Sequence, residues 1–445
     1  MNREKFGSRF GALMAMVGSA VGLGNMWRFP YMVGTNGGGA FVLVYLLCML
    51  LCLPIFLSEI IAGRRSKANA FGAYVRLAPG THWGLAGIIA VITPMIILSY
   101  YSVVGGWSLD YLLKALSFEF NSTNPELGSM FKDLSISTWR PLIMHSAFLL
   151  LTSLIIVSGV SKGIEGFSKV MMPTLFLLVT LMAVRSATLP GASEGFRWLF
   201  TPDFGKVNVT MVLSALGQAF FSLSIGFGIM MTYASYLDSD ANLFHFSTRT
   251  TIMDLVFSLI ASCAIMPAVF VFGVDPTSGP GLVYETLPFI FSKMPLGNVV
   301  AIIFFLTLLV AALTSSISLY EVGVAYLVEE KKVSRKLATA IVFALTWTGG
   351  VFCSLSFGPL SDATLFGLNI FSLFDYGSSN VLIVMGSLCL VIFVGWQMKK
   401  GDVKEEFTNG GTLAANGRIF NILYFVIRWI APVAILLIFI SNFLG

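Results

Sequence analysis

Eleven membrane-length apolar runs constrain the fold of this chain more than any other feature. A helix needs about twenty mostly apolar residues to cross the hydrocarbon core of a bilayer, and each run meets that length. With 56% hydrophobic and 11% charged residues, the chain does not resemble a soluble globular protein. Backbone groups in lipid must be satisfied internally, so the sequence predicts an all-α polytopic membrane protein with eleven transmembrane helices. The runs cover residues 9–34, 38–62, 85–113, 138–158, 167–187, 211–236, 252–274, 297–328, 336–355, 369–397 and 418–443.

Basic residues predict the orientation of these spans. If the N-terminus is cytoplasmic, most of the 27 Lys and Arg residues fall on cytoplasmic loops, including Arg64, Arg65 and the segment 331–336. Eleven crossings then place the C-terminus outside the cell membrane (the inner membrane of a two-membrane cell). The first run is expected to be retained, because Asn25 and Arg28 interrupt it and no small-residue cleavage site follows. The net charge of +5 is then topological and predicts the lipid bilayer, not nucleic acid, as a partner.

The first run is broken at its centre by residues that weaken a membrane helix. Gly18, Gly22 and Gly24 each cost a helix interior about 1 kcal/mol, and Pro30 lacks a backbone donor. Asn25 adds a polar side chain that lipid would penalise. Irregular backbone at membrane depth survives only where protein or a cavity surrounds it, so this segment is expected to be a binding site. The alternative is close helix packing, because Gly18 and Gly22 also form a GxxxG pair.

A second interruption, at residues 218–229, occupies the matching place five spans later. Ser222, Ser224, Gly226 and Gly228 crowd one point of the sixth apolar run. Paired broken segments at corresponding positions are typical of secondary transporters built from inverted repeats. We therefore expect a first five-helix repeat at 1–190 and an inverted second repeat at 191–400. A cytoplasmic loop and the eleventh helix would follow at 401–445.

These motifs resemble the neurotransmitter:sodium symporter family. The run GSAVGLGNMWRFPY at 18–31, NGGGAF at 36–41, QAFFSLSIGFG at 218–228 and ALTSSISL at 312–319 carry the resemblance. It extends from about Arg3 to the tenth span. The chain has eleven spans, as in a bacterial branch of the family, whereas animal members have twelve. The resemblance implies a leucine-transporter-like fold and sodium-coupled symport by alternating access.

The resemblance implies two sodium ions and no organic cofactor. One ion would bind carbonyls of Gly18, Val21 and Ala311 with hydroxyls of Thr314 and Ser315. Hard cations prefer such oxygen ligands, although paired hydroxyls in a span more commonly join helices. The other ion would bind the Ala20 carbonyl and the side chains of Asn25, Ser222 and Asp254, together with the carboxylate of the substrate.

The expected substrate is a neutral hydrophobic or aromatic L-amino acid. Relatives that carry biogenic amines have Asp at the position of Gly22, and glycine leaves room for a substrate carboxylate there. That carboxylate would contact the amides of Leu23 and Gly24 and the hydroxyl of Tyr101. The implied substrate-binding residues are Ala20, Leu23, Gly24, Ile97, Tyr101, Phe221, Ser222, Ser224, Phe227 and Leu319.

Asp254 is expected to substitute for chloride. Chloride-dependent members have Asn here and hold the anion beside it, while Tyr45, Gln218, Ser222 and Ser258 match the rest of that pattern. Opposite unit charges about 4 Å apart attract by about 4 kcal/mol at an effective dielectric near 20. A fixed carboxylate beside sodium therefore predicts chloride independence.

The resemblance also implies gates on both sides of the site. Arg28 and Asp375 would close the outer side above Tyr101 and Phe221. Arg3 and Glu329 would latch the cytoplasmic side, with Phe6, Ser235 and Tyr236 packed around them. Glu59, inside the second span, is expected to bind free amides of the first broken helix.

Other function classes fit the residues less well. The GxSxG-like run at 159–163 follows a membrane helix and not a strand, so an enzyme is not expected. No ATP-binding loop of the GxxxxGK[ST] type occurs. A channel would need a continuous pore lined by carbonyls or charges, and remains a remote alternative. The nearer alternative is a proton-coupled or exchange-type amino-acid carrier.

Overall fold

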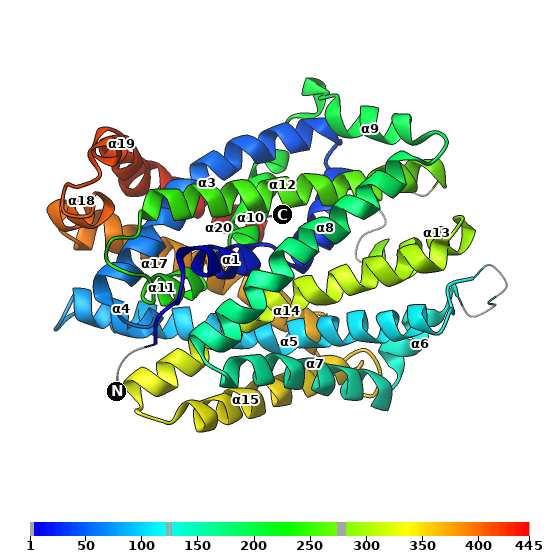
Figure 1. The fold of residues 1–445 in the computed structure, drawn as a ribbon, viewed down its shortest axis with the longest axis horizontal. Coiled ribbons are helices and arrows are strands. Elements are labelled where there is room, and N and C mark those ends of the chain that lie inside the picture. The colour runs from blue at the N-terminus through cyan, green and yellow to red at the C-terminus, as the bar shows by residue number, and fades with distance from the viewer. Residues whose placement is uncertain (1–3, 122–123, 125–126, 274–281, 445) are drawn as a thin grey trace.

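Long helices running roughly side by side form the body of the protein (Figure 1). The computed structural model describes residues 4–121, 124, 127–273 and 282–444. Most of the long spans form one helix or an unbroken series of helical segments. They are α3 (Gly39–Ser66), α5 (Gly84–Leu116), α7 (Trp139–Val157), η2 with α8 (Val160–Glu165, Gly166–Ala187), α12 (Leu243–Val271), α14 (Gly297–Glu330), α15 (Arg335–Leu355), the series α16, η5, α17 and η6 (Ile370–Tyr376, Gly377–Leu382, Ile383–Ile392, Phe393–Gln397), and the series α19, η7 and α20 (Ala414–Phe425, Val426–Ile430, Ala431–Leu444).

Two spans are broken where the sequence predicts breaks. In the first, α1 (Arg9–Ala20) is followed by η1 (Gly24–Arg28) and α2 (Phe29–Thr35), with a bend of 49°. In the other, α10 (Val209–Ser222) and α11 (Ile229–Ala234) are separated by six residues. Among the described residues, nine helices are long and apolar enough to cross a membrane, or ten with the bent first pair. Counting α10 and α11 as one interrupted span gives the expected eleven.

Short elements connect the spans at the two ends of the bundle. They are α4 (Ala70–Leu77), α6 (Met130–Ile136), α9 (Ala192–Phe200), η3 (Phe204–Lys206), η4 (Leu282–Thr286), α13 (Leu287–Lys293), α18 (Lys400–Phe407) and the antiparallel pair β1 (Thr364–Leu365) and β2 (Leu368–Asn369). The seventh span begins at Leu243, earlier than the predicted 252. The Asn242 side chain accepts the His245 amide at 3.2 Å and caps this more polar first part of the helix.

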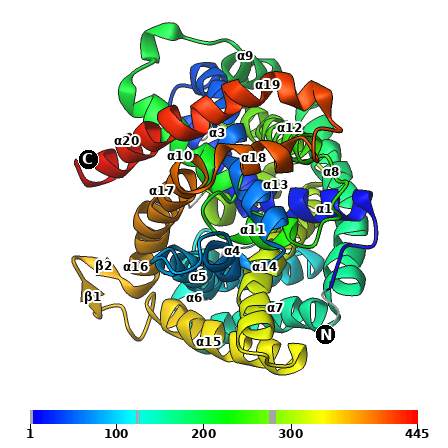
Figure 2. The same cartoon turned by 90° about the vertical axis from the view of Figure 1, so that its left-hand side faces the viewer.

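The broken spans lie inside the bundle. Viewed from the end that carries the N-terminus, α11 and α14 lie near the centre, whereas α15 and the α19–α20 series lie at the rim (Figure 2). α14 packs against α5, α8, α1 and α7, and most of its side chains are buried. The breaks are therefore surrounded by protein and not by lipid, as irregular backbone in a membrane requires.

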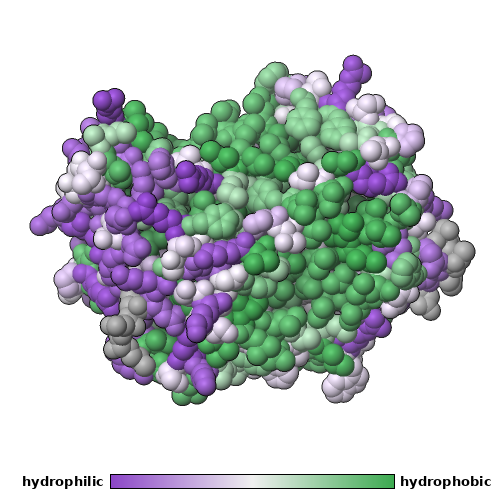
Figure 3. Space-filling view, in the orientation of Figure 1, coloured by the Kyte–Doolittle hydropathy of each residue, from purple (hydrophilic) through white to green (hydrophobic). Residues whose placement is uncertain are grey.

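The surface shows an apolar middle and a polar end. Hydrophobic side chains cover the centre of the face seen in Figure 3, and hydrophilic ones gather at the end that carries α4 and α18. An apolar region of this kind on one face matches the hydrocarbon layer, in agreement with a multi-pass membrane protein.

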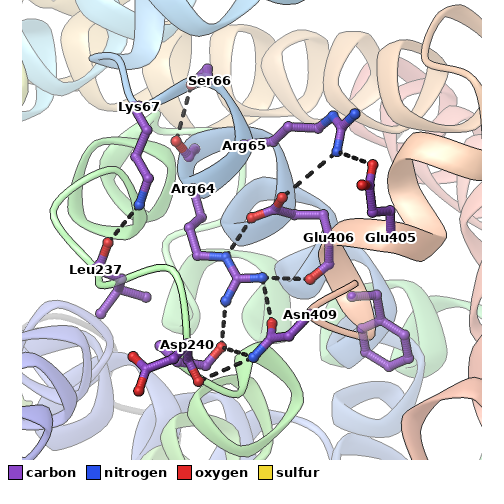
Figure 4. A network of polar contacts seen from close by, with 12 residues as sticks. Arg64, Arg65, Ser66, Lys67, Leu237, Asp240, Glu405, Glu406 and Asn409 are labelled. Carbon is purple, nitrogen blue, oxygen red and sulfur yellow. Dashed lines mark hydrogen bonds and ion pairs between the residues drawn. The ribbon is translucent and has the colours of Figure 1, made fainter. Parts of the chain in front are cut away.

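A buried arginine joins three segments at that polar end (Figure 4). The side chain of Arg64, at the end of α3, is 2% exposed and pairs with Glu406 of α18. It also donates to the Asn409 side chain at 2.7 Å and to the Ala241 carbonyl. Arg65 pairs with Asp402 at 3.0 Å, so α18 is fastened to the end of α3.

Candidate functional site

The two helix breaks meet at the centre of the protein. Val21 is extended (φ −79°, ψ 110°) and ends α1, while Ser224, Gly226 and Gly228 have φ of 54°, 83° and 71°. The Ser224 hydroxyl donates to the Ser19 carbonyl at 3.1 Å, which joins the breaks directly. These positive angles favour glycine, so the glycines at 226 and 228 are needed for the second break.

A polar cluster combines the first break with the sixth and seventh spans. The Asn25 side-chain amide donates to Ser222 Oγ (3.0 Å), Asp254 Oδ1 (2.7 Å) and Ser258 Oγ (2.8 Å). Ser222 also donates to the Asp254 carboxylate, at 2.9 and 3.0 Å. All four side chains are buried.

The residues of the other expected ion site also lie together, around the end of α1. Ser315 of α14 donates to the Val21 carbonyl at 3.5 Å, and Thr314 donates to the Ala311 carbonyl at 3.0 Å. A Cβ at Gly18 would lie 3.3 Å from the Thr314 Cβ, so glycine permits this approach. The neighbouring Ser316 instead bonds to Thr152 of α7 at 3.0 Å, which is a helix-joining role.

All ten residues expected to bind substrate line one small cavity between the breaks. Its volume is about 30 Å³, which has room for only a water or two. A substrate side chain would enter only after neighbouring side chains move. The Leu23 amide lies 3.4 Å from the Tyr101 hydroxyl, at the upper limit of a hydrogen bond. The lining consists of Ser19, Ala20, Gly22, Leu23, Gly24, Asn25, Ile97, Tyr101, Phe221, Ser222, Ser224, Phe227, Ile229, Ser315, Ser318 and Leu319.

A larger cavity of about 270 Å³ adjoins this one across Tyr101 and Phe221, which line both. Arg28 and Asp375 both line the larger cavity. The Arg28 guanidinium lies 4.6 Å from the centre of the Phe221 ring, and Asp375 accepts from Ser379 at 3.2 Å. No ion pair joins Arg28 to Asp375 in the part of the chain that the structure describes, so the closed outer gate stays a prediction.

The expected inner latch is only partly within the described residues. Arg3 lies outside them, while Glu329 accepts the Asn69 amide at 2.9 Å.

The sequence reasoning missed a second cluster of charged side chains around Glu321, which lies on the same helix as Glu329. Arg335 contacts Glu321 at 2.6 Å and Glu4 at 3.4 Å. Glu321 could have been singled out from the sequence, because it is a carboxylate inside the apolar run 297–328.

This second cluster also holds the N-terminal segment. The Tyr236 hydroxyl donates to Glu321 at 2.8 Å, and the Tyr236 carbonyl accepts the Phe6 amide at 3.3 Å. The Phe6 ring packs edge-on against Tyr233 and Tyr236. Phe6 and Tyr236 therefore pack together beside Glu321, whereas their expected packing around Arg3 and Glu329 stays a prediction.

The expectation for Glu59 was wrong about which broken helix it contacts. Its carboxylate accepts the amides of Gly226 (3.2 Å) and Met231 (3.5 Å), which belong to the second break and not the first. α3 packs against α11, so the side chain reaches amides within the break and in the first turn of α11. Sequence position alone did not distinguish two similar breaks.

Comparison with known proteins agrees with this architecture. The family model described as the sodium:neurotransmitter symporter family matches residues 3–126 and 120–445. The sodium-dependent transporter YhdH of Bacillus subtilis is 40% identical over 443 residues, covering 99% of this chain and 98% of that protein. A sodium-dependent transporter of Haemophilus influenzae is 34% identical over 453 residues, covering 99% of this chain and 98% of that protein.

A solved structure is also similar over its whole length. The crystal structure of MhsT in complex with L-phenylalanine has a TM-score of 0.91 and 40% identity, covering 99% of this chain and 100% of MhsT. These relatives are transporters and not enzymes, which confirms that expectation. The chain therefore belongs to the sodium:neurotransmitter symporter family and is a sodium-coupled membrane transporter.

Proposed function

We propose that this protein takes up neutral hydrophobic or aromatic L-amino acids together with two sodium ions, without chloride. The observation that carries the proposal is the small central cavity: of the described residues that line it, none is Asp, Glu, Lys, Arg or His. An acidic or basic substrate side chain would lose its hydration there without gaining a countercharge. Ile97, Phe227 and Leu319 instead offer apolar contacts. The L-phenylalanine complex of MhsT supports the same substrate class.

The amino-acid backbone of the substrate would bind at the breaks. Gly22 leaves space for its carboxylate, because a Cβ there would lie only 3.3 Å from the Tyr101 hydroxyl and closer still to Ser315. The carboxylate would accept from the Leu23 and Gly24 amides and from Tyr101. The ammonium group would face carbonyls of Ala20, Phe221 and Ser222, together with the Ser224 hydroxyl.

Both sodium ions would bind beside the substrate. One would lie among the Ala20 carbonyl, Asn25, Ser222 and Asp254, with the substrate carboxylate completing its ligands. The other would bind carbonyls of Gly18, Val21 and Ala311 and the hydroxyls of Thr314 and Ser315. In each set the ligand atoms are oxygens, which suit a hard monovalent cation.

The two halves would alternate access across the cell membrane. In this proposal residues 1–190 and 191–400 are the inverted repeats, and 401–445 are the loop and last span. The N-terminus is cytoplasmic and the C-terminus extracytoplasmic. The polar end in Figure 3, which carries Arg64, Arg65 and α18, would then face the cytoplasm.

Transport by purified protein in liposomes tests the proposal. We expect saturable uptake of Leu, Tyr, Phe or Trp that requires an inward sodium gradient and stops when choline replaces sodium. Competition by each of the twenty amino acids would define the side-chain preference. Better uptake of a dicarboxylic or dibasic amino acid would refute the substrate class. Undiminished uptake in choline, driven by a proton gradient or by exchange, would refute the coupling to sodium.

A further inference from the structure

The junction between the tenth and eleventh spans carries an unusual arrangement of two cations and aromatic rings. Arg428 lies within the apolar run 418–443. Its guanidinium carbon is 4.6 Å from the centre of the Trp396 ring and 5.5 Å from that of Trp429. The Lys400 ammonium lies 5.4 Å from the Tyr424 ring centre. Tyr424 and Arg428 are four residues apart in the last span, which is about one helical turn.

The helices are built to hold this arrangement. Trp396 and Arg428 lie in the π-helical turns η6 and η7, a form often found at functional sites. A Cβ at Gly395 would lie 3.1 Å from the Arg428 Cα, so glycine allows the close crossing. The Trp396 indole donates to the Arg428 carbonyl at 3.1 Å, and the Tyr424 hydroxyl donates to the Gly395 carbonyl at 2.9 Å.

The nearby acidic side chains are already engaged elsewhere (Figure 4). All three acids of α18 face the end of α3. Asp402 and Glu405 pair with Arg65 at 3.0 and 3.2 Å, and Glu406 pairs with Arg64. Within the residues that the structure describes, no ion pair joins Lys400 or Arg428 to a carboxylate, and the buried Arg428 Nε has no hydrogen-bond partner. Because these two cations have no carboxylate partner among the described residues, they are free to pair with an anion from outside the chain.

The surroundings identify the chemistry of that anion. Trp396 and Trp429 are about half exposed (49% and 50%), and Ile430 and Val433 beside them are also exposed. Tryptophan on an apolar surface is typical of the membrane interface, at the level of the lipid headgroups. Here the tenth span ends and the polar Lys399 and Lys400 follow. A phosphate at this depth would meet the guanidinium, while the acyl chains would lie along the exposed apolar side chains.

We propose that Arg428, with Lys400, binds the phosphate of an anionic phospholipid on the aromatic platform of Trp396, Tyr424 and Trp429. Arginine suits this role because its planar guanidinium stacks on indole and still directs several N–H donors at phosphate oxygens. The site is separate from the central cavity, so lipid would bind whether or not substrate is present.

Lipid titration of the delipidated, purified protein tests this site. Native mass spectrometry would count the bound lipids, and the thermal unfolding midpoint would report their effect on stability. We expect phosphatidylglycerol to bind and to raise the midpoint more than phosphatidylcholine does. Arg428→Gln should weaken phosphatidylglycerol binding by about fivefold or more, the effect of one cation near a lipid surface. Arg418→Gln is the matched control and should bind phosphatidylglycerol as the wild type does. Arg418 is an exposed cation of the same series of helices, and in the described residues it contacts no aromatic platform.

Two further measurements separate the proposal from its rivals. Trp396→Phe, which keeps an aromatic ring but removes the indole N–H, should reduce the preference for phosphatidylglycerol even if Arg428→Gln does not fold. Inorganic phosphate at millimolar concentration should not displace the lipid. Equal binding of the two lipids to wild type, or an unchanged lipid preference in both variants, would overturn the proposal. Displacement by inorganic phosphate would assign the site to a soluble anion instead.

Discussion

At the scale of single residues, the position of Asp254 carries the largest electrostatic consequence. It is fully buried and its carboxylate contacts Asn25 and Ser222, both expected sodium ligands. A fixed negative charge here removes the need for a mobile anion beside sodium. We therefore predict that replacing chloride by gluconate leaves wild-type uptake unchanged. Asp254→Asn should lower uptake in chloride-free buffer by about tenfold or more. A tenfold loss corresponds to about 1.4 kcal/mol, which is only part of the attraction of about 4 kcal/mol between the carboxylate and sodium.

The chloride dependence of the variant distinguishes this explanation from simple misfolding. Added chloride should partly restore uptake by Asp254→Asn, because Tyr45, Ser222 and Ser258 remain able to cradle an anion. Ser262→Ala provides the control, since this buried hydroxyl of the same helix has no hydrogen-bond partner in the described structure and should be dispensable. A several-fold fall of wild-type uptake in gluconate would contradict the prediction whatever the variants do.

At the scale of elements, the second broken span depends on a side chain from a different helix. Glu59 of α3 accepts amides that the break between α10 and α11 leaves without helical partners. A buried amide that loses its acceptor costs about 1–3 kcal/mol, so the break is stable only while Glu59 is present. Glu59→Ala should therefore lower the thermal unfolding midpoint and abolish sodium-dependent uptake. Glu59→Gln keeps one acceptor oxygen, so its midpoint and uptake should lie between those of the wild type and of Glu59→Ala.

The adjacent Ser58 offers a matched control for the loss of Glu59. Its side chain is equally buried but, among the described residues, donates only to the Ile55 carbonyl of its own helix, at 2.6 Å. Ser58→Ala should unfold close to the wild-type midpoint and retain uptake. If Glu59→Ala matched Ser58→Ala in both measurements, the carboxylate would not be the cap of the break.

At the scale of the whole molecule, transport requires the outer cavity to close above the bound substrate. Arg28 is placed for this step, because it lies over Phe221 and shares the cavity of about 270 Å³ with Asp375. It is absent from the lining of the central cavity. Arg28→Ala should therefore reduce the rate of sodium-driven uptake at least several-fold while equilibrium binding of the same amino acid changes much less. Loss of binding in parallel with uptake would instead make Arg28 part of the substrate site.

Several features of this chain could be predicted from local composition alone. Apolar runs of membrane length fixed the spans, and glycine and serine clusters fixed the two breaks, because both follow from the cost of exposing backbone groups to lipid. The ten residues that the family resemblance implies for substrate binding lie around one cavity in the structure. Their roles in binding remain predictions.

Contacts between groups far apart in the sequence became visible only in the folded chain. Asp254 reaches Asn25 across 229 positions, and Glu59 contacts the second break although the first lies nearer in sequence. Arg335 contacts both Glu321 and Glu4, which lies near the N-terminal end, and Arg28 and Asp375 share a cavity without an ion pair in the described structure. Such contacts depend on how helices cross and rotate against each other, which residue spacing along one helix does not specify, because each span here packs against several neighbours at once.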